Sequence, residues 1–99
     1  MATLGYDNDA LADLVRIALF LAGDDEAAAV RALELIQDAV AILTLHPLIG
    51  RPAPRNLREL VVSLGATGYI VLYAYSQAGD HVQIHGVRHQ REAGFDEET

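Results

Sequence analysis

Three side chains capable of polar chemistry lie close together near the end of the sequence, namely Arg88, His89 and Arg91. An imidazole between two guanidinium groups can serve as a general base, and the arginines can stabilise a developing negative charge. A histidine at the end of a strand more often only makes hydrogen bonds, so both roles stay open for His89. This cluster is the first candidate for a functional site.

The remaining histidines and the lack of cysteine bear on metal binding. His81 and His85 fall four residues apart on one face of a predicted strand, too far apart for an easy shared metal, and no third ligand is evident. The chain has no cysteine, which excludes disulfides and thiolate metal sites and fits a reducing compartment. We therefore expect no metal and no cofactor.

The candidate cluster follows the last of three predicted strands. Residues 57–64, 69–75 and 81–87 are rich in β-branched and aromatic residues and alternate along the chain. Short glycine-containing loops join them, which predicts an antiparallel meander over residues 57–88. In the last strand, alternation places Val82, Ile84 and Gly86 on one face and His81, Gln83, His85 and Val87 on the other.

Two groups of side chains on this meander could contact a partner. Tyr69, Tyr73 and Tyr75 share one side of the middle strand, and they either form an exposed surface that grips a partner or fill the core with their rings. Arg58 on the first strand could meet a carboxylate or phosphate of a partner, or it could pair with a nearby glutamate at the surface.

The first half of the chain predicts an antiparallel helical hairpin over residues 8–45. Apolar residues recur there at three- and four-residue spacing in two runs. The first run contains Ala10, Leu11, Leu14, Val15, Ala18, Leu21 and Ala22, and the second contains Ala29, Val30, Leu33, Ile36, Val40 and Leu43. We expect Gly23 to end the first helix in a left-handed conformation and Pro47 to end the second.

The segments around the hairpin complete the predicted fold. Residues 46–56 hold three prolines and a glycine, which predicts an irregular connector whose carbonyls Arg51 would hold. Thr3–Tyr6 is either a short edge strand or a flexible lead-in. We therefore predict one α+β domain over residues 1–99, with the hairpin packed on a three- to four-stranded antiparallel sheet and a tail over residues 89–99.

Charge and hydropathy exclude several classes of function. The net charge of −7 is divided into −6 over residues 1–49, +3 over residues 50–91 and −4 over residues 92–99. All seven cationic residues are arginines, and this balance argues against non-specific binding of nucleic acid. No apolar stretch is long enough to span a membrane and no signal peptide is evident, so we expect a cytoplasmic protein.

The order of the predicted pieces carries a resemblance to a known family. A helical hairpin is followed by His46–Pro52, Arg58–Leu60, Gly68–Tyr73 and Val87–Phe95. Over roughly residues 9–95, this order resembles the RelE/ParE superfamily of toxins from bacterial type II toxin–antitoxin modules, which includes proteins labelled plasmid stabilisation. The closing residues 89–95 are the most telling part.

The resemblance implies one of two activities. RelE-like members cut messenger RNA in the ribosomal A site with lysines and arginines on the sheet face and a C-terminal aromatic residue, whereas ParE-like members bind DNA gyrase and cut nothing. This chain has Val61 and Ser63 in place of lysines, Ile70 in place of an arginine, and Phe95 in place of a tyrosine. Because phenylalanine cannot transfer a proton, we expect a ParE-like toxin that acts by protein–protein contact.

The resemblance also implies a cognate antitoxin as partner, with the chain in a homodimer or in a toxin–antitoxin hetero-oligomer. The antitoxin would wrap an extended or helical segment across the hairpin and the open sheet face. The residues expected to contact partners are Arg58, Tyr73, Tyr75, Arg88, His89, Arg91 and Phe95. In the alternative of a ribosome-dependent endonuclease, Arg58, Arg88, His89 and Arg91 would be catalytic, and a third alternative is an inactive relic that only binds its antitoxin.

Overall fold

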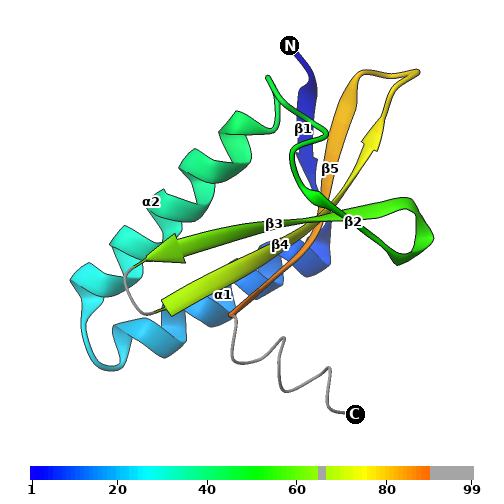
Figure 1. Ribbon diagram of the computed structural model, residues 1–99. Coiled ribbons are helices and arrows are strands. Elements are labelled where there is room, and N and C mark those ends of the chain that lie inside the picture. Colours follow the sequence, from blue (N-terminus) through cyan, green and yellow to red (C-terminus); the bar gives the residue numbers. More distant parts are fainter. Residues whose placement is uncertain (65–66, 90–99) are drawn as a thin grey trace.

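The computed structural model describes residues 1–64 and 67–89, and it is shown in Figure 1. Its elements in chain order are β1 (Thr3–Tyr6), α1 (Asn8–Ala22), α2 (Glu26–Ile42), β2 (Arg51–Ala53), a 3₁₀ turn (Pro54–Asn56), β3 (Leu57–Leu64), β4 (Thr67–Ser76) and β5 (His81–His89). The strands form one sheet in the order β1-β5-β4-β3-β2. The predicted α+β class and meander are confirmed. The sheet has five strands and is mixed, because β1 runs parallel to β5.

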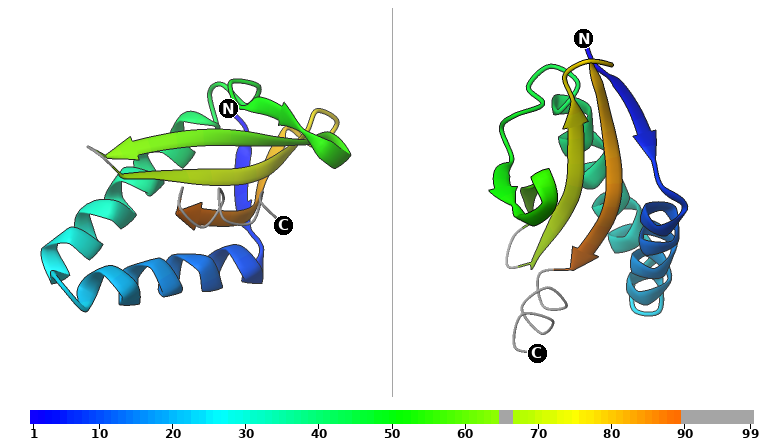
Figure 2. Two further views of the ribbon diagram at one scale, coloured as in Figure 1. Left: turned by 60° about the horizontal axis from the view of Figure 1, so that its bottom comes forward. Right: turned by 90° about the vertical axis from the view of Figure 1, so that its right-hand side faces the viewer.

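Both helices cover the same face of the sheet, as the left view of Figure 2 shows. The core between the two layers includes Ile36, Val40 and Leu43 from α2 and Val71, Val82 and Ile84 from the sheet. Tyr69 and Tyr73 belong to this core and are almost fully buried. Of the two interpretations of the tyrosine row, the core is therefore the observed one for these two rings. In the described part of the chain, no helix is long and apolar enough to cross a membrane.

Helix α1 carries two apolar lines where one had been expected. Ala10 and Ile17 are buried against the sheet, whereas Leu11, Val15 and Leu19 are exposed. The prediction that Leu11 and Val15 face the core is wrong, because at 3.6 residues per turn Leu11 lies about 100° and Val15 about 140° around the helix from Ala10. Apolar spacing alone could not tell the two lines apart.

The turn between the helices also departs from expectation. Gly23 has φ −59° and ψ −30°, which is right-handed helical geometry, so the predicted left-handed ending is wrong. The Gly23 N–H instead lies near the carbonyl oxygens of Leu19 and Leu21. Asp25 caps α2, since its side chain accepts a hydrogen bond from the Ala27 N–H at 2.9 Å.

The predicted irregular connector contains a short strand. Arg51, Pro52 and Ala53 of β2 pair with Glu59, Arg58 and Leu57 of β3. The prolines in this segment disfavoured a strand, because proline lacks an N–H group. At the edge of a sheet that group needs no partner, so β2 tolerates Pro52.

A β-bulge in β5 changes the predicted alternation. Leu72 pairs with Gly86 and Tyr73 pairs with Ile84, so His85 is the extra residue. Strict alternation predicted that Val87 lies on the opposite face of the strand from Val82 and Ile84. The extra residue shifts the period by one and places Val87 in the core with them, where it is fully buried.

Candidate functional site

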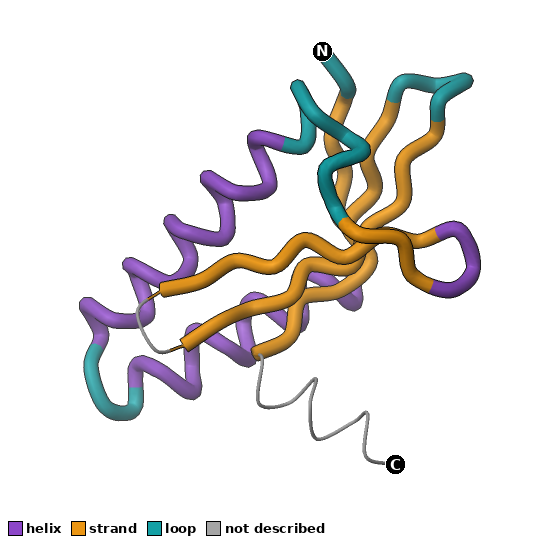
Figure 3. The backbone as a smooth tube through the Cα atoms, viewed as in Figure 1, coloured by secondary structure: helices purple, strands orange, loops and turns teal. Residues whose placement is uncertain are grey.

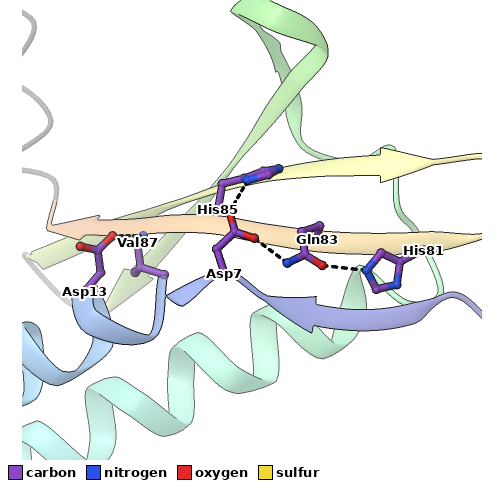
Figure 4. Close-up of polar contacts among 6 residues, drawn as sticks. All are labelled: Asp7, Asp13, His81, Gln83, His85 and Val87. Atoms are coloured by element: carbon purple, nitrogen blue, oxygen red, sulfur yellow. Dashed lines mark hydrogen bonds and ion pairs between the residues drawn. The ribbon is translucent and has the colours of Figure 1, made fainter. Parts of the chain in front are cut away.

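A chain of hydrogen bonds runs along the outer face of β5 and ties it to the start of the protein, as Figure 4 shows in part. Thr3 Oγ1 lies 2.6 Å from His81 Nδ1, and His81 Nε2 lies 2.8 Å from Gln83 Oε1. Gln83 Nε2 donates to Asp7 Oδ1 at 2.6 Å, and His85 Nδ1 lies 2.6 Å from Asp7 Oδ2. We call these five residues the polar chain.

Local geometry explains why the polar chain forms. Gly5 pairs with Gln83 across the β1–β5 ladder, and a Cβ at Gly5 would lie 2.6 Å from Gln83 Oε1, so glycine leaves room for these side chains. The hydrogen bonds from Gln83 and His85 lower the pKa of Asp7 below its usual value. The polar chain therefore favours an ionised Asp7 in the folded state.

A second carboxylate, that of Asp13 on α1, also bonds to β5. Asp13 Oδ2 accepts a hydrogen bond from the Val87 N–H at 2.9 Å, and its Oδ1 pairs with Arg16 at 3.3 Å. Since β1 ends beside Ile84, Asp13 takes the place of a strand partner for the end of β5. Both carboxylates thus hold α1 and β1 to β5.

The polar chain connects Thr3 and Asp7 to β5. Both His81 and His85 are occupied by contacts within the protein. Among the described residues, no group of three or more histidine or acidic side chains could hold a metal ion. Sequence reasoning missed Asp7 and Gln83, because no local pattern indicates a contact between residues that are 76 positions apart.

Arg58 and Tyr73 fix the connector in place. Arg58 Nη1 donates to the carbonyl oxygens of Leu48 at 3.1 Å and Gly50 at 2.7 Å. Tyr73 Oη accepts from the Gly50 N–H at 2.9 Å and donates to the Pro47 carbonyl at 2.8 Å. Burial raises the pKa of Tyr73. Tyr73 is thus buried in the core and offers no surface to a partner, contrary to the expectation of a contact residue.

The prediction that Arg51 holds the carbonyls of the connector is wrong. Arg51 Nε instead donates to Glu59 Oε1 at 2.9 Å, and Arg58 makes the bonds to the connector carbonyls. Arg58 was expected either to meet a partner or to pair with a surface glutamate. Its half-buried position beside β2 explains the difference, because the carbonyls of the connector lie within reach of its side chain.

Tyr75 is half-buried and lies at the end of β4. Its hydroxyl donates to Asp80 Oδ1 at 2.8 Å, and this hydrogen bond together with desolvation raises the pKa of Tyr75. Unlike Tyr73, it keeps part of its ring accessible. It therefore remains a candidate for contact with a partner.

The structure separates Arg58 from the C-terminal cluster. Arg58 pairs with the buried Tyr73, whereas the exposed Arg88 pairs with Ile70, so the two arginines lie on opposite faces of the sheet. The His89 ring packs edge-on against Tyr69, with centroids 5.3 Å apart and planes at 89°. Arg91 and Phe95 lie outside the described residues. The four arginine and histidine side chains proposed for catalysis are thus not brought together as one described site.

Comparisons with known proteins agree with this fold. Residues 4–94 match the family described as the ParE toxin of type II toxin–antitoxin system, parDE. Toxin RelE3 of Caulobacter vibrioides is 38% identical over 80 residues, which cover 81% of this chain and 85% of that protein.

A solved structure supports the fold independently of close sequence similarity. The chromosomal ParDE TA system from P. aeruginosa superposes with a TM-score of 0.69 at 22% identity, covering 89% of this chain and 95% of that one. At that identity the likeness concerns the fold alone. The resemblance inferred from the sequence is nevertheless confirmed by the match to the family, which spans nearly the whole chain: this protein belongs to the ParE toxin family of type II toxin–antitoxin systems.

Proposed function

We propose that this toxin inhibits its target by binding to it, without cutting RNA, and that a cognate antitoxin neutralises it by covering its binding surface. The target envisaged is a cytoplasmic enzyme such as DNA gyrase. The observation that carries this proposal is the separation of Arg58 from Arg88 and His89, which leaves the described sheet without a convergent catalytic set.

Cleavage of RNA needs a proton acceptor, a proton donor and cations placed around the same phosphate. Arg58 donates to two connector carbonyls, and His81 and His85 lie in the polar chain. The sequence contains no lysine, since all seven of its cationic residues are arginines. These features favour a surface that binds over one that catalyses.

Two assays test this proposal, one with the purified chain and one in cells. The first measures supercoiling of relaxed plasmid by DNA gyrase, which should fall as the chain is added in excess. The second maps messenger RNA ends by primer extension after induced expression, and these ends should not change. Full supercoiling activity together with new codon-linked cuts would establish the endonuclease instead. Normal growth with neither response would favour the inactive relic.

A further inference from the structure

The connector and the β4–β5 turn lie at the end of the molecule away from the α1–α2 turn (Figure 3). Residues of both segments line one groove. It has a volume of about 820 Å³, within the range of sites that take a drug-sized ligand or a few side chains. Residues that line it include Leu45, Leu48, Pro52, Leu57, Arg58 and Tyr75. We call it the connector groove.

Three exposed aliphatic side chains line the groove. Leu45, Leu48 and Ile49 all line the groove, and 60%, 59% and 52% of their surfaces are exposed. These three large aliphatic side chains line the same groove and make an apolar patch there, whereas single exposed leucines are common on proteins. Such a patch beside a hollow is typical of a site that binds a protein segment.

The groove is also formed before any partner arrives. Its wall is the proline-rich connector, and the sheet holds that wall through Tyr73 and Arg58, which together make four hydrogen bonds to Pro47, Leu48 and Gly50. A wall fixed in this way loses little conformational freedom on binding, which increases affinity.

Charge identifies the kind of partner. Arg58 lines the groove, and the exposed Arg55 directly precedes the lining residue Asn56 in the chain. No acidic side chain is among the residues described as lining the groove, although the first half of the chain carries a charge of −6.

We propose that the connector groove docks an acidic, extended segment of a protein partner, with aliphatic side chains against Leu45, Leu48 and Ile49 and carboxylates facing Arg55 and Arg58. This inference deepens the proposed function, on which it rests, by naming the chemistry of a partner. A single-stranded nucleic acid fits less well, because such sites use a series of aromatic side chains for base stacking, and the residues described as lining the groove include two aromatic rings, Tyr75 and His46.

Fluorescence polarisation with a defined probe tests the proposal on the full chain. The probe is a fluorescein-labelled ten-residue peptide of alternating glutamate and leucine, and its counterpart has lysine in place of every glutamate. The glutamate peptide should bind and the lysine peptide should bind at least about tenfold more weakly, because Arg55 and Arg58 repel it. Equal binding of the two peptides would overturn the proposal.

Variants place the binding on the groove. The double variant Leu48→Ser/Ile49→Ser changes two exposed side chains, so it should fold and yet bind the glutamate peptide about tenfold more weakly. The matched control is Leu19→Ser on α1, which changes an exposed leucine far from the groove and should bind like the wild type. The single variant Arg55→Glu should also weaken binding. Unchanged binding by the double variant, or displacement of the peptide by an oligothymidine, would exclude a protein-docking groove.

Two further measurements separate this inference from the proposed function. If sedimentation shows a dimer that the double variant abolishes, the groove is occupied by a second copy and the proposal is wrong. If gyrase retains full activity while the peptide still binds in the groove, the proposed function fails and the docking site stands. If gyrase is inhibited while no groove variant changes peptide binding, only the docking site fails.

Discussion

At the scale of single residues, the contact between Tyr73 and Gly50 decides how the connector meets the sheet. The variant Tyr73→Phe keeps the buried ring but leaves the Gly50 N–H and the Pro47 carbonyl without their hydroxyl partner. We expect it to lower the free energy of unfolding by about 1–3 kcal/mol, measured by urea denaturation. Tyr75→Phe, which loses one hydrogen bond at an exposed site, should change it by less than about 1 kcal/mol. Equal effects of the two variants would contradict this account.

Gly50 is needed in this contact because nothing larger fits. A Cβ at position 50 would lie 2.6 Å from Tyr73 Oη and 2.9 Å from the Glu59 carbonyl oxygen. Gly50→Ala should therefore destabilise the fold by about 1–3 kcal/mol in thermal unfolding. Gly79→Ala serves as the control, since its nearest contact would be 3.6 Å, and a comparable loss there would show that glycine content alone matters.

Asp7 makes part of the stability depend on pH. Its pKa is lowered in the folded state by hydrogen bonds from Gln83 and then from His85, so the carboxylate stabilises the fold above the ordinary value of 3.8. That contribution is lost as the pH falls below 3.8 and Asp7 takes up a proton. Urea unfolding should show Asp7→Asn to be less stable than the wild type at pH 7, with a smaller difference at pH 3. A difference that does not change with pH would contradict this assignment.

At the scale of elements, the bulge in β5 determines which valines reach the core. The variant Val87→Ala should cost about 2 kcal/mol of unfolding free energy, because Val87 is fully buried. Val61→Ala is the matched control on β3, where 47% of the valine is exposed, and it should cost about 0.5 kcal/mol or less. If strict alternation held in solution, both variants would have similarly small effects.

The elements differ in how far local sequence specifies them. The strands over 57–64 and 81–87 and both helices have regular apolar periods, and the structure contains each of them. β1 and β2 are short edge strands that exist through their partners β5 and β3. Their sequences hold glycine or proline, which disfavour strands elsewhere, so local pattern could not establish them.

At the scale of the whole molecule, the two layers share one core. Helix α2 contributes Ile36 and Val40 to the same core cluster as residues of strands that are distant in sequence. An isolated peptide of residues 8–46 should therefore lose most of its structure. We expect its helical signal in circular dichroism to be less than about half of that expected for α1 and α2 in the full chain. A fully helical peptide would show that the hairpin folds by itself and would contradict a single domain.

The candidate site shows the same division between local and tertiary information. From sequence, Arg58, Arg88 and His89 were plausible members of one cluster because all are cationic or titratable. In the sheet, Arg58 pairs with Tyr73 and His89 pairs with Tyr69, so these two side chains lie at different positions along β4. Arg88 lies on the other face of the sheet. Facing directions depend on strand register, and in β5 the bulge changes that register.

The sequence by itself determined the family, the α+β class, the helical hairpin and the meander, because each of these is recorded in local periodicity or in the order of short segments. Only the tertiary structure decided that Tyr69 and Tyr73 lie in the core, that Arg58 holds the connector, and that Asp7 joins Gln83 and His85. Those contacts join residues far apart in the chain. They depend on which faces and edges meet after folding, and no local pattern records that.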